Sequence, residues 1–170
     1  MQFNVGDKVV YPNQGVGIIQ DVCQKHIAGE HAEFYLLKLR GNNSTVMVPT
    51  GNADHVGLRL LSTAKQLEAL FEILKRNSDQ PEPDWKSRYK ENVEKMKTGS
   101  IFEVAKVLKN LYCLNYQKTL SFREKKMYDR ALQLVISEIA TVQDDPTEEI
   151  GVVVQEFLLT SCEQNGPQTA

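Results

Sequence analysis

The stretch Val5-Gly6-Asp7-Lys8-Val9-Val10-Tyr11-Pro12-Asn13-Gln14-Gly15 decides how the first part of the chain folds. Its β-branched run from Lys8 to Tyr11 predicts a strand, and the turn-forming cluster from Pro12 to Gly15 predicts where that strand ends. A second β-rich run, Val16 to Val22, follows at once. Two strands joined by so short a turn indicate the first hairpin of an antiparallel sheet.

The same alternation of strands and turns continues to residue 61. Residues 25–31, with Gly29, predict a hairpin connection, and residues 41–44 predict a turn. The expected strands on either side of that turn cover residues 33–40 and 45–48. Short strands at this spacing are typical of a small antiparallel β-barrel of the SH3 or Tudor kind.

From Ser62 onward the apolar spacing becomes helical. Leu67, Leu70, Phe71 and Leu74 follow the i, i+3, i+4, i+7 rule, and the polar, proline-containing residues 77–84 then predict a linker. A further helix is expected over 85–99, and two more should begin at the capping boxes Ser100-x-x-Glu103 and Ser121-x-x-Glu124. The last helix is expected over 147–159, and its buried residues should be Ile150, Val153, Val154, Phe157 and Leu158.

The predicted fold class is therefore α+β: an N-terminal Tudor/SH3-like antiparallel β-barrel followed by a C-terminal all-α helical bundle. The expected domains are 1–61 for the barrel, 62–84 for a connecting helix and linker, 85–160 for the helical domain and 161–170 for a disordered tail.

Composition places the chain among globular proteins, because 41% of its residues are hydrophobic and 25% are charged. The start of the chain lacks the basic and apolar segments of a signal peptide, and no apolar run is long enough to span a bilayer. Cys23, Cys113 and Cys162 are odd in number and widely spaced. We therefore expect no disulfide framework, no membrane association and a cytoplasmic location.

The charge distribution is uneven although the formal net charge is only −2. Residues 1–80 carry eight basic and eight acidic side chains. Residues 81–130 carry 12 basic and seven acidic side chains, whereas residues 131–170 carry seven acidic and no basic ones. Only the middle segment is suited to an anionic partner.

Motifs for nucleotide binding, hydrolysis and zinc-dependent proteolysis are absent from the sequence. Cys23, His26 and His31 form a metal-like cluster, but a zinc site needs more ligands, and only His55 is near in sequence. The carboxylates at 144–145 and 148–149 are explained by a helix N-terminus. We expect no enzymatic activity, no catalytic or metal-binding residue, no cofactor and no small-molecule substrate.

The most informative segment is Trp85-Lys86-Ser87-Arg88-Tyr89-Lys90, which holds the only tryptophan. In one interpretation Trp85 begins an apolar stripe with Tyr89, Val93 and Met96, as aromatic residues at helical spacing commonly do. In the other, Trp85 is exposed at the helix start and contacts bases while the flanking cations hold phosphates. A second basic cluster, Arg123 to Lys126, opens a later helix.

These segments resemble the CarD/CdnL family of bacterial transcription regulators. The barrel part of the resemblance rests on residues 5–15, the strand 33–39, Val48-Pro49 and residues 52–59, and a similar motif occurs in the polymerase-binding module of transcription-repair coupling factor. The helical part rests on Trp85-x-x-Arg88-Tyr89-Lys90-x-Asn92-x-Glu94-Lys95 and Leu120-Ser121-x-x-Glu124-Lys125.

The resemblance implies that the barrel binds the β subunit of bacterial RNA polymerase by strand addition. The positions that match family residues at this contact are Lys25, His26, Ile27 and Met47. The chain departs from the family pattern here, because arginine is usual at the positions of Lys25 and Met47. Lys25 keeps the charge without bidentate geometry, and Met47 loses the charge.

The resemblance also implies that Trp85 wedges into the minor groove of promoter DNA at the upstream edge of the transcription bubble. The DNA-binding residues expected on this basis are Trp85, Lys86, Arg88, Lys90, Lys125 and Lys126. The function that follows is a monomeric, cytoplasmic, nucleoid-associated regulator that stabilises the open promoter complex. The alternative is a polymerase-binding protein–protein adaptor without direct DNA contact.

Overall fold

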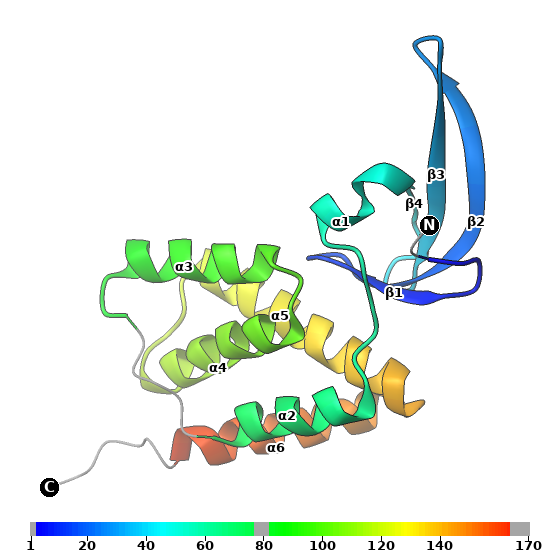
Figure 1. Ribbon diagram of the computed structural model, residues 1–170. Coiled ribbons are helices and arrows are strands. Elements are labelled where there is room, and N and C mark those ends of the chain that lie inside the picture. The colour runs from blue at the N-terminus through cyan, green and yellow to red at the C-terminus, as the bar shows by residue number, and fades with distance from the viewer. Residues whose placement is uncertain (1–2, 77–81, 164–170) are drawn as a thin grey trace, which may run out of the picture. The chain divides into compact units, whose positions relative to one another are not determined.

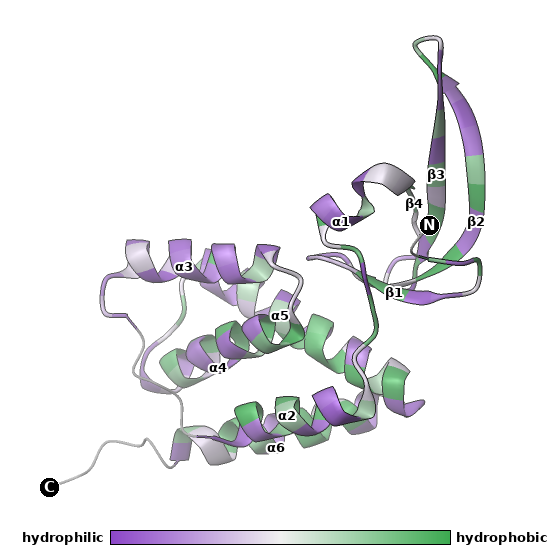
Figure 2. Cartoon of the chain, viewed as in Figure 1, coloured by the Kyte–Doolittle hydropathy of each residue, from purple (hydrophilic) through white to green (hydrophobic). Residues whose placement is uncertain are grey.

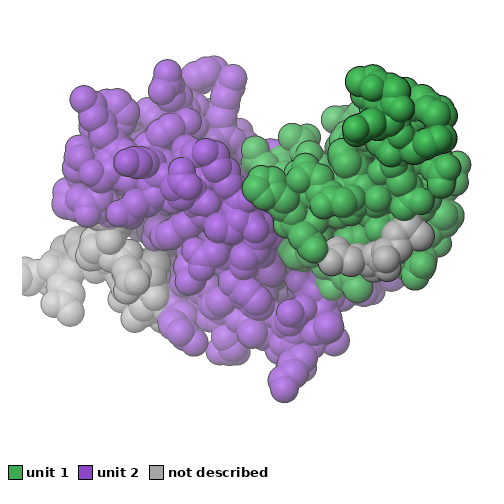
Figure 3. Space-filling view, turned by 45° about the horizontal axis from the view of Figure 1, so that its top comes forward, with its two compact units in different colours: residues 1–61 green, residues 62–170 purple. Residues whose placement is uncertain are grey.

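The computed structural model describes residues 3–76 and 82–163. The chain divides into two compact units, residues 1–61 and 62–170 (Figure 3). The first unit is built on an antiparallel sheet, and in the described part of the second unit every regular element is a helix (Figure 1). The predicted α+β fold class, strands first and helices second, is confirmed.

The first unit is built on one five-stranded antiparallel sheet with the strand order β4-β3-β2-β1-β5. A short 3-10 turn and helix α1 lie between β4 and β5. β4 and β5 are the two ends of this order, so each pairs with one neighbour only. The elements are β1 (Lys8–Tyr11), β2 (Gly15–Ile27), β3 (Glu30–Leu39), β4 (Thr45–Pro49), α1 (Ala53–Val56) and β5 (Arg59–Leu60).

The hairpin between β2 and β3 is longer than the sequence predicts. Residues 25–31, expected to form a connection, are paired almost to the tip, with Ile27 opposite Glu30. Only Ala28 and Gly29 form the turn, and both have positive φ, 53° and 82°. Two positive φ values match a tight two-residue hairpin turn, which needs no further loop residues.

One face of the sheet packs on an apolar core that includes Tyr35, Leu37 and Val48. The backbone of β2 approaches β3 so closely at Gly17 that a Cβ there would lie 2.7 Å from Leu37 Cδ1 and 2.9 Å from the Lys38 carbonyl oxygen. Glycine at this position therefore permits the packing of the two longest strands.

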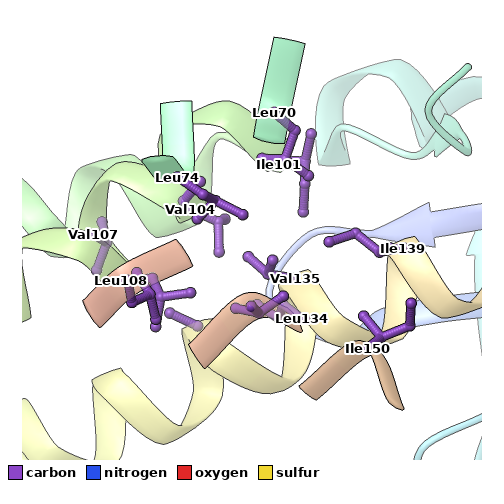
Figure 4. Close-up of a cluster of buried hydrophobic side chains, with 14 of the residues drawn as sticks. Leu70, Leu74, Ile101, Val104, Val107, Leu108, Leu134, Val135, Ile139 and Ile150 are labelled. Atoms are coloured by element: carbon purple, nitrogen blue, oxygen red, sulfur yellow. The ribbon is translucent and has the colours of Figure 1, made fainter. Parts of the chain in front are cut away.

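The second unit holds five helices in the part of the chain that the structure describes, and they pack around one apolar core (Figure 4). Leu70, Leu108 and Ile139, from three different helices, are completely buried in it. The helices are α2 (Ala64–Lys75), α3 (Trp85–Lys97), α4 (Ile101–Gln117), α5 (Phe122–Gln143) and α6 (Thr147–Glu163).

Helix α2 belongs to this core rather than serving as a connector, in contrast to the predicted segment 62–84. Its residues Leu67, Leu70 and Leu74 are buried. At its start, Ser62 Oγ donates to Glu138 Oε1 of α5 over 2.7 Å. At its end, the buried Lys109 of α4 donates to the carbonyl oxygens of Ile73 and Arg76, both over 2.6 Å. The polar residues 77–81 of the predicted linker lie outside the described residues.

The sequence predicts where the helices begin, but it does not predict all the side-chain hydrogen bonds that cap them. Ser121 Oγ accepts from Glu124 N over 3.2 Å, as expected, but the Glu124 carboxylate turns toward Arg88. The predicted capping box at Ser100 is wrong, because no side chain caps α4. A complete capping box instead opens α2, between Thr63 and Gln66.

Helix α6 corrects two further expectations. It continues to Glu163, beyond the predicted end at 159, and a disulfide joins its buried Cys162 to Cys113 of α4. The expectation of no disulfide is therefore wrong. The expectation of a disordered tail is wrong for residues 161–163, which are helical, and residues 164–170 lie outside the described residues. Val153, predicted to be buried, is 36% exposed, because α6 packs through Ile150, Val154 and Leu158.

Replacing Gly17 by alanine tests the close approach of β2 to β3. The new methyl group would push against a backbone oxygen that cannot move without distorting the sheet, so we expect a loss of about 1–3 kcal/mol in unfolding free energy. Urea unfolding followed by far-UV circular dichroism measures this loss. Gly41→Ala is the matched control, because nothing lies within 4 Å of its added Cβ. Equal stability of the two variants would contradict the conclusion that the close approach of β2 to β3 requires glycine at position 17.

Candidate nucleic-acid and polymerase interfaces

Trp85 is the first residue of α3 and is 57% exposed. Side chains in a helix lean toward the preceding turn, and a residue at the first position has no preceding turn to cover. Lys86 Nζ lies 5.8 Å from the centroid of the Trp85 ring, within the range of a cation–π contact. The interpretation of Trp85 as the start of a buried stripe is therefore wrong.

The N-cap Asp84 fixes the start of this helix. Its Oδ2 accepts hydrogen bonds from Ser87 Oγ at 2.8 Å and Ser87 N at 3.3 Å. The Ser87 side chain is the main reason that the pKa of Asp84 lies below its usual value. An ionised cap at the helix N-terminus holds the first turn, and with it Trp85, in place.

The face of α3 that turns inward begins with two polar residues and ends with an apolar one. Its buried residues are Arg88, Asn92 and Met96, spaced four apart, and Asn92 Nδ2 has no hydrogen-bond partner among the described residues. Tyr89 and Val93 are only partly buried. Figure 2 shows α3 as a largely hydrophilic helix. Of the apolar stripe Trp85, Tyr89, Val93 and Met96 that spacing predicts, only Met96 is fully buried.

Arg88 is 3% exposed and joins the start of α3 to the start of α5. Its Nε donates to Glu124 Oε2 over 2.9 Å and its Nη2 to Glu124 Oε1 over 3.2 Å, a bidentate arrangement. Its Nη1 donates to the Glu82 carbonyl oxygen over 2.8 Å. The predicted contact of Arg88 with the DNA backbone is corrected: the guanidinium is used inside the protein, where it positions the helix that carries Trp85.

The second basic cluster lies at the beginning of α5, around Glu124. Lys125 and Lys126 are both exposed, but they point in different directions. Lys126 is about 200° around the helix from Glu124, and its Nζ lies 4.5 Å from the ring centroid of Phe122. Phe122 is 73% exposed, more than Trp85. This aromatic residue was not among the predicted site residues, although its position at the start of a helix is visible in the sequence.

The exposed cations nearest to Trp85 in sequence are Lys86 and Lys90. They are four residues apart and share one face of α3, turned away from the buried Arg88. The structure thus keeps Lys86, Lys90 and Lys125 available to an anionic partner, and Arg88–Glu124 ties their two helices together.

The residues expected to contact polymerase divide between the two faces of the sheet. Lys25 pairs with Ala32 and Met47 with Leu36, so both lie on the face opposite the core, as does Ile27. Met47 is partly buried and belongs to β4, an end strand of the sheet. This arrangement leaves one long side of β4 without a strand partner among the described residues.

His26 lies on the other face, where its ring is tilted against that of its cross-strand partner His31, with 3.8 Å between the ring centroids. Cys23 shares the face of Lys25, since side chains alternate along β2. The sheet therefore separates the metal-like cluster Cys23, His26 and His31. Within residues 3–76 and 82–163 no three His, Cys, Asp or Glu side chains are grouped to hold a metal ion.

Two family models match the chain: the CarD-like/TRCF RID domain over residues 3–62, and CarD, C-terminal domain, over residues 69–155. The chain is 33% identical over 148 residues to a protein of Bacillus subtilis (strain 168) described as "Putative transcription factor YdeB", covering 87% of this chain and 97% of that one. The chain is also similar to the solution NMR structure of the 72-residue N-terminal domain of Myxococcus xanthus CarD, with 39% sequence identity and a TM-score of 0.31. The match covers 35% of this chain and 79% of that chain.

An RID domain followed by a CarD C-terminal domain defines a class of transcription regulators that associate with RNA polymerase. The chain belongs to the CarD family, and the resemblance seen in the sequence is confirmed. No helix among the described residues is long and apolar enough to cross a membrane.

Single substitutions of the buried pair test its role in fixing α3. Arg88→Met or Glu124→Gln leaves a buried charge or acceptor without its partner, so each should lower the unfolding free energy by about 3–5 kcal/mol. The double variant should lose less than the two single losses added together, because neither partner is then stranded.

Chemical denaturation of the helical unit, followed by the fluorescence of its single tryptophan, measures these losses. Lys86→Met is the control, since it removes an exposed cation from the same helix and should change stability by less than about 0.5 kcal/mol. Losses below about 1 kcal/mol for both single variants would show that the pair does not hold the two helices together.

Proposed function

We propose that the chain docks on the β subunit of bacterial RNA polymerase through its sheet and stabilises the open promoter complex by inserting Trp85 into the minor groove at the upstream edge of the bubble. One observation carries the proposal: a tryptophan that is 57% exposed stands at the start of a helix whose inner side is fixed by a buried ion pair. An exposed aromatic ring at the start of a helix that is itself held in place is suited to contact unstacked bases.

The wedge acts by selecting one conformation of DNA. In closed duplex the bases are stacked and leave no space for an indole, whereas at the edge of the bubble one stacking partner is already lost. A ligand that binds only the open state shifts the closed–open equilibrium toward it. Stacking of an aromatic side chain on a base contributes about 1–3 kcal/mol, and about 1.4 kcal/mol already changes the equilibrium tenfold.

The cations around Trp85 give this contact its electrostatic support. Lys86 and Lys90 are exposed on α3 and Lys125 is exposed on α5. They can neutralise phosphates on the two sides of the wedge. Lys126, also expected to bind DNA, lies beside Phe122 on the far side of α5 from Glu124. Its proposed contribution is therefore only a long-range attraction for the phosphates.

Docking on polymerase is proposed to use the unpaired side of β4 and the face that carries Lys25, Ile27 and Met47. Strand addition supplies main-chain hydrogen bonds, and neighbouring side chains supply specificity. Met47 lies opposite Leu36, so the contact there is apolar where the family usually has arginine. His26, on the other face, is proposed to contact polymerase only if the partner reaches around the hairpin.

Tethering allows the DNA contact itself to be weak. Once the sheet is bound, the helical unit of the same chain is held near the promoter at a high effective concentration, so a monomer is sufficient. No bond is made or broken in this mechanism, and the proposal requires no cofactor. Binding to free duplex should accordingly be weak and should decline steeply with salt.

The proposal predicts that Trp85→Ala shortens the lifetime of the open complex. We expect the wild-type chain to lengthen this lifetime and the variant to lose most of the gain, about tenfold if one stacking contact is removed. The measurement follows competitor-resistant open complexes with native polymerase over time.

Phe122→Ala is the matched control, because it removes an even more exposed aromatic residue, 73% against 57%, from the first position of another helix and should keep the wild-type effect. Capture of the β subunit by the Trp85→Ala variant must remain unchanged, whereas Lys25→Glu should weaken it. If Trp85→Ala prolongs the lifetime as well as the wild type does, the wedge is excluded and the adaptor function is favoured.

A further inference from the structure

The outer side of the last helix carries a groove that the proposed function does not use. Its volume is about 520 Å³, and most of its lining comes from one stripe along α6: Glu148, Gly151, Val152, Gln155, Glu156 and Leu159. These positions recur every three or four residues, so they share one face of the helix. Tyr112 of α4 and Ile136 of α5 form the opposite side.

The centre of this groove is apolar and accessible. Val152 is 59% exposed and Leu159 is 39% exposed, although α6 has already buried Ile150, Val154 and Leu158 in the core. The helix therefore has two apolar faces, one covered by its own domain and one left uncovered. Solvent-exposed apolar side chains gathered in one hollow are typical of an interaction site.

Gly151 forms the middle of the groove and is not required by packing. A Cβ at this position would meet only Ile136 Cδ1, at 3.6 Å, an ordinary van der Waals contact. Glycine in the interior of a helix is less stable than alanine. Its effect here is to keep the floor of the groove free of a side chain, so that another backbone can approach α6 closely.

The α6 side of the groove is acidic. Residues 131–170 contain seven acidic and no basic side chains. Glu148 and Glu156 belong to the lining itself, and Glu149 and Glu163 are exposed on the same helix. This charge repels nucleic acid and anionic lipid surfaces, and it attracts a cationic protein segment.

We propose that this groove binds a basic amphipathic helix of a partner protein. The stripe from Glu148 to Leu159 extends for about 17 Å, or about three helical turns. An apolar stripe on the incoming helix would cover Val152 and Leu159 over the open floor at Gly151, and its lysines or arginines would lie beside Glu148 and Glu156. This is the helix-in-groove mode of recognition, in which apolar anchors repeat every three to four residues.

The test uses the full chain and a fluorescent model peptide of about 12 residues with leucines at helical spacing and lysines elsewhere. We expect saturable binding, at least tenfold tighter than that of a peptide in which every lysine is glutamate. Gly151→Met, which fills the floor, and Glu156→Lys, which reverses a lining charge, should each weaken binding at least tenfold. Circular dichroism verifies that both variants remain folded.

Glu149→Lys is the matched control, because it makes the same charge change on α6 outside the groove, and it should alter binding much less. Absence of saturable binding, or equal losses for Glu149→Lys and Glu156→Lys, would overturn the proposal. Self-association of the chain that Gly151→Met abolishes would also overturn it, in favour of a second copy as the occupant. None of these results depends on polymerase or DNA, so they leave the proposed function untouched.

Discussion

The buried ion pair between Arg88 and Glu124 is the interaction on which the arrangement of the helical unit's basic surface depends. It links two helix starts that are 36 residues apart in sequence, and its side chains are only 4% and 7% exposed. A buried pair of this kind is costly to break, because each partner then remains desolvated without its counter-charge. The pair thereby fixes the direction of α3, and with it the place of Trp85 at the protein surface.

The two units supply different parts of the proposed mechanism. The sheet offers an end strand, β4, which has a strand partner on one side only among the described residues and carries Met47 on the face opposite the core, while the helical unit offers one exposed indole among lysines. In the proposed mechanism, affinity comes mainly from the sheet, and discrimination between closed and open DNA comes from the helical unit. The proposed contact of Met47 is apolar, so it requires an apolar polymerase surface where the family usually has arginine.

Sequence patterns predicted the order of strands and helices because they depend on local periodicity and turn residues. They did not predict the role of Arg88, since a charged residue on a helix is normally solvated and its partner Glu124 belongs to another helix. The disulfide was missed for a related reason. Cys113 and Cys162 each continue the buried stripe of their own helix, which the spacing of apolar residues in the sequence already shows. A single sequence does not show which of these stripes face each other in the bundle. The exposure of Phe122 was not predicted either, because an aromatic residue beside a helical apolar stripe is usually buried.

The central claim is that Trp85, rather than another exposed aromatic residue, contacts the upstream edge of the bubble. Photo-crosslinking tests it directly: 5-iodouracil is placed at that edge of a promoter bound to native polymerase and this chain, and the crosslinked residue is identified by mass spectrometry. We expect a crosslink to Trp85, and we expect it to be lost in Arg88→Met, where α3 is no longer held. A crosslink to Phe122, or none from a chain that is demonstrably bound to polymerase, would contradict it.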